Sequence, residues 1–156
     1  MNSAGSIDAG QRGQRRAESV LVLVYTKDSD VLLLQRSDNI DYWQSVTGAL
    51  ETDELPMAAA HRELREETGL ILKLVDHKQT RRYPITEQWR PRYPEWATDN
   101  TEHLFSVCIK SRVKVRLDPA EHLDSRWLNA RHALSAVFSA TNREAIKQIA
   151  LSDHVD

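Results

Sequence analysis

Three glutamates, Glu63, Glu66 and Glu67, crowd one short segment of this 156-residue chain. The segment predicts a helix that begins at Pro56 and ends at Gly69, because the proline suits a first turn, alanines and a leucine follow, and the glycine suits a left-handed cap. Spacings of three and four residues place the carboxylates on one side of that helix, where each like-charged pair costs about 0.2–0.5 kcal/mol. Hard divalent cations prefer such clustered oxygens. The pattern therefore predicts a metal site.

The residues around this helix fit a longer signature without a gap. Gly48 is followed after five residues by Glu54 and after seven more by the run 62–70, RELREETGL. This run is similar to the signature of the Nudix hydrolases, which act on nucleoside diphosphates linked to another moiety. Leu55 departs from the Ser or Thr that can cap this helix in many relatives, which weakens the start of the helix but removes no ligand. The resemblance implies an α/β fold, an α/β/α sandwich with a mixed central sheet.

Composition indicates an ordinary globular protein. Lys and Arg total 21 and Asp and Glu 23, so the net charge of −2 gives no bulk attraction to nucleic acid or to an anionic membrane. No apolar run approaches the roughly 18 residues of a membrane span, and the N-terminus lacks the apolar core of a secretory signal. Cys108 is the single cysteine, and its apolar, strand-like surroundings predict a buried thiol. We therefore expect a cytoplasmic monomer that binds neither nucleic acid nor membranes.

The chain divides into a tail and one domain. Residues 1–17 are polar and glycine-bearing and predict a flexible N-terminal tail, so residues 18–156 form the single domain. Short runs rich in β-branched and apolar residues predict strands, and two segments near the C-terminus predict helices. The predicted strands are 19–25, 31–36, 71–75, 80–85, 101–109, 113–115 and 125–128, and the predicted terminal helices are 131–138 and 141–151. Prolines interrupt residues 79–99, where a long loop is expected after the strand.

The metal site is expected to draw on four glutamates. Glu63 and Glu67 share one helical row and are predicted ligands, with Glu66 as a further ligand or as the base that activates water. Arg62 stands four residues before Glu66 and is expected to orient a carboxylate rather than bind substrate. Glu121 is the candidate ligand from outside the helix. A lone loop glutamate is usually only a solvated charge. The expected cation is Mg²⁺, with Mn²⁺ as an alternative.

Further blocks resemble the bacterial Nudix enzymes that act on dihydroneopterin triphosphate. They are WQSVTG at 43–48, NTE at 100–102, EH at 121–122 with WL at 127–128, and Ser139 with NR at 142–143 and AI at 145–146. The resemblance implies that Glu63, Glu67 and Glu121 hold Mg²⁺. It also implies substrate contacts from Arg15, Arg36, Thr47, Tyr83, Pro84, Ile85, Thr86 and Ser139.

These substrate contacts have physical support of unequal strength. Arg36 can fork onto phosphate oxygens, and Thr47 offers a hydroxyl. Arg15 stands where the relatives have lysine, which keeps the charge but changes the geometry. The loop after Tyr83 differs from theirs in most residues, although its aromatic side chains could stack on a pterin ring. For Ser139, a helix cap is an equal alternative to substrate contact.

The implied reaction is Mg²⁺-dependent hydrolysis of dihydroneopterin triphosphate to the monophosphate and pyrophosphate, a step in folate synthesis. A nucleoside triphosphate such as dATP is the alternative substrate, because purine and pterin rings share hydrogen-bonding edges. A ligand sensor without catalytic activity is the alternative of another class. The intact glutamates argue against a sensor, since it has no need of a self-repelling set of carboxylates. A nucleic-acid-binding module is disfavoured by the acidic balance and the absence of a basic aromatic stripe.

Overall fold

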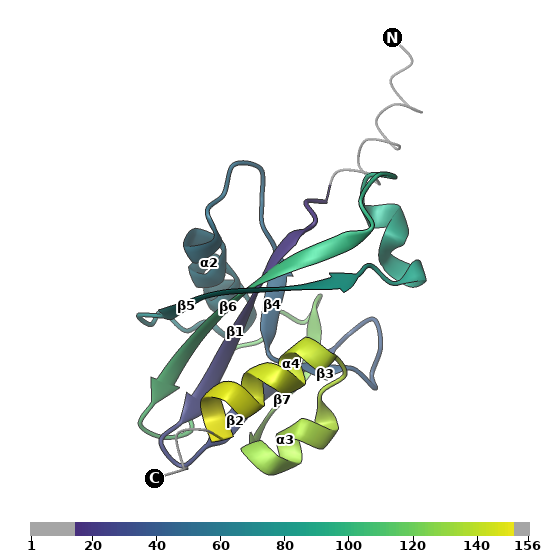
Figure 1. Cartoon of the computed structure of the whole chain (residues 1–156). Coiled ribbons are helices and arrows are strands. Elements are labelled where there is room, and N and C mark those ends of the chain that lie inside the picture. Colours follow the sequence, from purple (N-terminus) through teal and green to yellow (C-terminus); the bar gives the residue numbers. More distant parts are fainter. Residues whose placement is uncertain (1–14, 152–156) are drawn as a thin grey trace.

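The structure is a computed structural model that describes residues 15–151 of the chain. A mixed sheet of seven strands forms its centre, and helices lie on both faces of the sheet (Figure 1). The strands are β1 (Glu18–Thr26), β2 (Asp30–Arg36), β3 (Trp43–Gln44), β4 (Val46–Ala49), β5 (Val75–Pro84), β6 (Asp99–Ile109) and β7 (His122–Asn129). The helical segments are α2 (Pro56–Thr68), the 3₁₀ segment η1 (Glu87–Arg92), α3 (Ala130–Ala136), α4 (Ala140–Ala145) and the π-helical segment η2 (Ile146–Leu151). The predicted α/β class with a mixed sheet is confirmed.

Strand β1 lies in the middle of the sheet. The order is β3-β2-β1-β6-β5, while β4 pairs with β1 and β7 pairs with β2. β1 runs parallel to β6 from Glu18, opposite Thr101, to Thr26, opposite Ile109. The other pairs are antiparallel. A parallel pair needs a long crossover connection, and here that connection contains α2 and β5.

Two apolar cores lie on the two faces of the sheet. Val20, Val22 and Val24 of β1 pack with Leu64 of α2 on one face. The residues between them on β1 pack with α3, α4 and η2 on the other face, where Ile146 is fully buried. Because both faces are covered, β1 reads as a continuous apolar run rather than an alternating one. The arrangement is the expected α/β/α sandwich.

Two predicted strands are wrong. Residues 71–74 form no strand, and β5 begins only at Val75. Residues 113–115 are likewise irregular. In both segments alternate apolar residues pack against the core under α2, so the alternating pattern reflects anchoring of a loop and not a hydrogen-bonded ladder. The apolar residues in and beside these segments that pack against this core are Leu70, Leu72, Leu74, Val115 and Leu117.

Other boundaries also differ. β5 starts earlier than predicted because a bulge between Asp76 and Thr80 lets it pair with more of β6, and Lys78 has a φ of 52° there. The expected loop after β5 contains η1. Cys108 is exposed, so the predicted buried thiol is wrong. Cys108 lies near the end of β6, beyond the point where β5 begins to pair with it at Ser106.

The predicted tail falls mostly outside the described residues, since residues 1–14 are not described. Residues 15–17 are in place against the domain. The Arg15 N–H donates to the Arg92 carbonyl oxygen at 3.0 Å, and the Thr101 N–H donates to the Ala17 carbonyl oxygen at 3.0 Å. Within residues 15–151, no helix has the length and apolar character needed to cross a membrane.

Candidate functional site

Helix α2 is held in place by packing and by its C-terminal cap. Leu55 precedes it without a side-chain capping bond, as its departure from Ser or Thr implies, and Pro56 occupies the first turn. Gly69 has a φ of 79° and its N–H donates to the Arg65 carbonyl oxygen, which is the predicted left-handed cap. Leu64 is fully buried against the sheet. The helix therefore presents its glutamates from a fixed position.

Arg62 of α2 makes hydrogen bonds to the segment that precedes the helix. Its Nε and Nη2 groups donate to the two carboxylate oxygens of Glu54, each at 2.8 Å, and Nη2 also donates to the Ala49 carbonyl oxygen. Its Nη1 group donates to Glu66 Oε1 at 3.0 Å and lies 3.4 Å from Glu63 Oε1. These bonds raise the pKa of Arg62 and lower that of Glu54. Arg62 thus orients carboxylates, as expected from its spacing.

Gly48 of β4 leaves the space that Glu63 occupies. A Cβ atom at Gly48 would lie 1.2 Å from Glu63 Oε2 and 2.1 Å from its Cδ. The φ angle of Gly48 is not in the left-handed region, so the requirement for glycine here is one of close approach. Strand β4 and helix α2 together fix the position of the Glu63 carboxylate.

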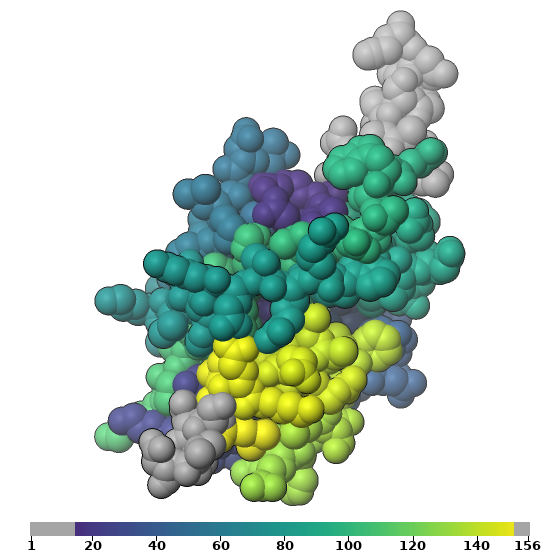
Figure 2. Space-filling view, viewed as in Figure 1, coloured from purple at the N-terminus to yellow at the C-terminus, as the bar shows by residue number. Residues whose placement is uncertain are grey.

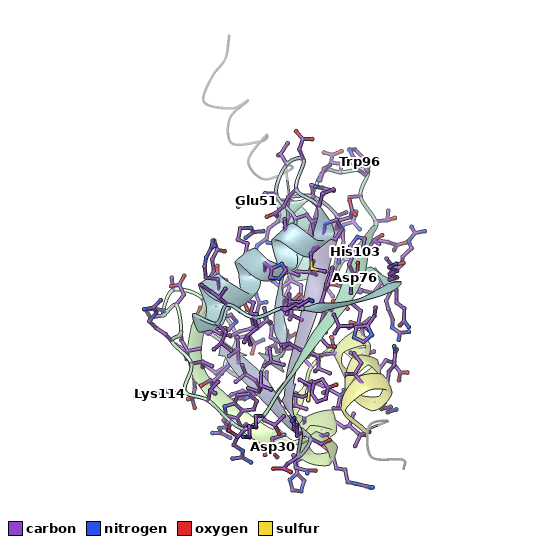
Figure 3. The ribbon with its side chains drawn as sticks, turned by 90° about the vertical axis from the view of Figure 1, so that its left-hand side faces the viewer. Asp30, Glu51, Asp76, Trp96, His103 and Lys114 are labelled. Atoms are coloured by element: carbon purple, nitrogen blue, oxygen red, sulfur yellow. The ribbon has the colours of Figure 1, made fainter. Side chains whose placement is uncertain are left out.

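A loop beyond β6 brings further carboxylates to the helix. The loop that carries Lys114 runs beside the C-terminal end of α2 (Figure 3), and the Arg116 N–H donates to the Thr68 carbonyl oxygen at 2.8 Å. The loop then turns, with the Glu121 N–H donating to the Asp118 carbonyl oxygen. As a result Asp118 and Glu121 face α2 from the same turn.

Five carboxylates line one pocket of about 370 Å³. They belong to Glu63, Glu66, Glu67, Asp118 and Glu121. The structure therefore brings all four predicted glutamates together. Asp118 was missed by the sequence analysis, although its spacing of three residues from Glu121 in a turn was a usable signal.

The negative charge in this pocket is poorly compensated. Glu67 is only 3% exposed, and its Oε1 has no hydrogen-bond partner among the described residues. Burial, and then the neighbouring Glu63 and Glu121, raise the pKa of Glu67 well above its usual value. Burial raises the pKa of Glu63 to about 8, although Arg62 opposes that shift. Such a site is suited to a cation.

His122 does not supply the missing positive charge. Its Nε2 lies 3.8 Å from Glu67 Oε1, but burial, helped by Arg36, lowers the pKa of His122 to about 4. The imidazole is therefore neutral at neutral pH, and the proximity of the two groups is not an ion pair. Hard cations also prefer oxygen ligands, so we do not expect His122 to bind the cation.

The carboxylates do not form a finished cage. Within residues 15–151 no three His, Cys, Asp or Glu side chains already surround one common point as metal ligands do. Mg²⁺ usually keeps several waters and is completed by substrate phosphates. An open acidic pocket of this kind fits that mode of binding better than a closed structural site.

Two of the predicted substrate contacts are arginines held against aromatic rings. The Arg36 guanidinium lies 5.0 Å from the Trp89 ring, and its Nε donates to Asp38 at 2.7 Å. The hydrogen bond to Asp38, followed by the charges of Glu121 and Glu67, raises the pKa of Arg36. Arg15 lies 5.7 Å from the Tyr93 ring. Both rings belong to η1 or the residue after it, so both cations face this segment.

The remaining predicted contacts have structural partners of their own. The Thr47 hydroxyl donates to the Val20 carbonyl oxygen at 2.8 Å. Ser139 caps α4 by accepting from the Asn142 N–H at 3.0 Å, so the capping alternative is observed and substrate contact stays a prediction. The Tyr83 hydroxyl accepts from Asn100 at 3.0 Å. Of the other residues in that stretch, Pro84 ends β5, Ile85 is buried and Thr86 precedes η1.

Residues 15–149 match the NUDIX domain. A dihydroneopterin triphosphate diphosphatase of Haemophilus influenzae is 40% identical over 137 residues, which cover 84% of this chain and 85% of that protein. The protein of the same name from Escherichia coli K12 is 37% identical over 144 residues, covering 88% of this chain and 95% of the relative. The solved structure of the E. coli dihydroneopterin triphosphate pyrophosphohydrolase superposes with a TM-score of 0.84 at 36% identity, over 90% of this chain and 99% of that one.

Proposed function

This chain belongs to the Nudix family, and we propose that it hydrolyses dihydroneopterin triphosphate to dihydroneopterin monophosphate and pyrophosphate. The family signature fixes the phosphoanhydride chemistry and leaves the substrate open. The observation that supports this substrate is the similarity to the H. influenzae and E. coli enzymes, which covers most of this chain and most of each relative. That similarity extends beyond α2 to the strands of the sheet and to the C-terminal helices on its other face.

The acidic pocket is the proposed site of a divalent cation, which Nudix hydrolases generally use. The ligands proposed are Glu63, Glu67 and Glu121, with Glu66 and Asp118 beside them. The unpaired, buried Glu67 Oε1 supports this assignment, because a cation would supply its missing partner. Mg²⁺ is the proposed ion and Mn²⁺ the alternative. When bound, it supplies positive charge that offsets the repulsion between phosphate oxygens and an incoming nucleophile.

Glu66 is the proposed base. Its side chain is 49% exposed, unlike those of its helical neighbours Glu63 and Glu67, so water reaches it. Arg62 donates to its Oε1 at 3.0 Å, which orients this exposed carboxylate to accept a proton from an attacking water. Arg62 acts as a positioning residue in this account, because it contacts carboxylates and not the reacting atoms.

Two arginines have donors left for phosphate oxygens. Asp38 holds the Nε and Nη2 groups of Arg36, which leaves most of its Nη1 group for a phosphate. The buried Nε of Arg15 has no hydrogen-bond partner within residues 15–151. Positive charge placed this way stabilises negative charge that develops during hydrolysis.

A substrate panel tests this function. Purified protein with Mg²⁺ is assayed on dihydroneopterin triphosphate, dATP and dGTP, and kcat/KM is compared. We expect the pterin substrate to give the highest value. A higher value for dATP would make the protein a nucleoside triphosphate pyrophosphatase. Tight binding of a triphosphate with no turnover of any substrate would instead favour the sensor.

Replacing Glu121 with alanine is expected to lower kcat/KM at least about tenfold. The free energy of unfolding of the metal-free protein should stay within about 0.5 kcal/mol, because Glu121 is exposed. A Mg²⁺ titration of activity, with urea unfolding alongside, measures both. Asp28→Ala, at an exposed turn far along the chain from the pocket, is the matched control. Equal activity of wild type and Glu121→Ala at every Mg²⁺ concentration would mean that Glu121 is a solvated charge in a loop and not a metal ligand.

A further inference from the structure

Polar side chains gather on the sheet face opposite α2. Ser19 of β1 pairs with Glu102 of β6, and Tyr83 of β5 pairs with Asn100 of β6. Alternate residues of a strand point to the same face, so Asn100 and Glu102 share the face of Leu104, which packs with the C-terminal helices. We call the four residues Ser19, Tyr83, Asn100 and Glu102 the polar face. It occupies the part of the sheet surface where that apolar core stops.

Asn100 has a buried acceptor without a partner. The residue is 2% exposed. Its Nδ2 group donates to Ser19 Oγ at 2.7 Å and to Tyr83 Oη at 3.0 Å, which uses both amide hydrogens. The Oδ1 atom makes no hydrogen bond within the described residues. Since buried acceptors are nearly always satisfied, this oxygen indicates a donor that arrives from elsewhere.

Glu102 is a second buried acceptor on the same strand. It is 6% exposed, and in the described part of the chain no ion pair joins it to a cation at 4 Å or less. Arg81 lies opposite it on β5 but donates to Gln148 at 3.0 Å. Burial raises the pKa of Glu102 to about 7, although a hydrogen bond from Thr141 and the charge of Arg81 oppose that shift. Incoming N–H donors would stabilise its ionised form.

The polar face is within reach of the acidic pocket. Strand β4 lies on the other side of β1, with Ala49 opposite Ser19 and Thr47 opposite Leu21. Two strand spacings, about 10 Å, therefore separate β4 from Glu102. The three-carbon side chain and the triphosphate of the proposed substrate can span that distance. The backbone of Thr47 hydrogen-bonds Glu67 of the pocket. Figure 2 shows the molecular surface hollowed between β5 (teal) and α4 (yellow), beside this face.

We propose that Glu102 and Asn100 bind the ring of the substrate by its 2-amino-4-oxo edge. This inference rests on the proposed function for the identity of the ring. That edge presents an N3–H and a 2-amino group side by side, and two adjacent donors match the two oxygens of the Glu102 carboxylate. Asn100 Oδ1, which has no partner among the described residues, would accept a further hydrogen from the edge. Adenine instead presents one donor beside one acceptor, so it matches a carboxylate poorly.

The Glu102→Gln variant tests this pairing, because glutamine offers one donor and one acceptor in the same shape. We expect the ratio of kcat/KM for dihydroneopterin triphosphate to kcat/KM for dATP to fall about 10- to 100-fold. The ratio for dGTP to dATP should fall with it, since guanine carries the same edge. Retained dATP turnover reports that the variant is folded. Glu144→Gln, at an exposed position of α4, is the matched control and should keep both ratios.

A measurement on the wild-type protein does not depend on any variant folding. Dihydroneopterin without phosphates should inhibit dATP hydrolysis competitively, whereas its 3-methyl derivative, which lacks the N3–H, should inhibit at least about tenfold more weakly. Equal inhibition by both compounds would overturn the proposal. Unchanged ratios in Glu102→Gln, or equal losses on all three substrates, would also overturn it. If wild type fails to hydrolyse dihydroneopterin triphosphate, the proposed function is wrong, and the dGTP to dATP ratio still tests Glu102.

Discussion

Replacing Glu67 with glutamine is expected to reduce turnover at least about 100-fold and to leave the protein folded. Glutamine keeps the shape of the side chain but removes the charge that would hold a divalent cation. The same change should raise the unfolding temperature of the metal-free protein. Glu67 is buried beside Glu63 and Glu121 and has an oxygen without a partner, so losing its charge relieves both desolvation and repulsion.

Turnover is measured across a Mg²⁺ titration, and thermal unfolding is followed with EDTA present. Glu144→Gln serves again as the exposed control. Wild-type activity of Glu67→Gln at limiting Mg²⁺ would mean that Glu67 is not a metal ligand. A lower unfolding temperature of Glu67→Gln would mean that the negative charge of Glu67 stabilises the metal-free protein, and would contradict the expected repulsion.

Gly48→Ala is expected to lower activity about as much as the loss of a glutamate of the proposed metal site. Gly48 itself carries no reactive group. Its Cβ would fall 1.2 Å from Glu63 Oε2, so the Glu63 side chain must rotate out of its place. The clash involves the end of a flexible side chain. The free energy of unfolding should therefore change by no more than about 1 kcal/mol, as for an ordinary substitution.

A double-mutant comparison tests the cause of that loss. If Gly48→Ala acts by displacing Glu63, adding it to Glu63→Gln should lower kcat/KM by less than about threefold more. A full additional loss in the double variant would mean that Gly48 acts by another route, such as the approach of substrate to β4. Wild-type activity in the single variant would show that the pocket does not need Glu63 where the structure places it.

The parts of the structure that local rules decide could be predicted from the sequence. Helix α2 begins at Pro56 and ends at the Gly69 cap because proline and glycine restrict or permit backbone angles whatever surrounds them. The spacing of the glutamates then put three carboxylates on one side of the helix. Arg62 could be assigned to Glu66 in advance for the same reason, since a separation of four residues fixes the contact.

Features that depend on partners distant in sequence could not be predicted. The alternation at 71–75 and 113–115 indicated strands, yet those apolar residues anchor loops, because no neighbouring strand was available to pair with them. Asp118 joins the pocket only because a loop returns to α2 through Arg116. The polar face likewise depends on the register of β1, β5 and β6, which the sequence of any one strand does not specify.

The most direct measurement of the central claim is identification of the first phosphate product in ¹⁸O-labelled water. Carboxylates around the proposed cation site, with Arg36 beside them, suit water attack at an internal phosphorus and departure of pyrophosphate. With dihydroneopterin triphosphate and no added pyrophosphatase, we predict pyrophosphate and dihydroneopterin monophosphate in equal amounts, with the ¹⁸O label in the monophosphate because pyrophosphate leaves, and no early orthophosphate. Orthophosphate as the first product would mean attack at the terminal phosphorus, and would contradict both the proposed mechanism and the proposed function.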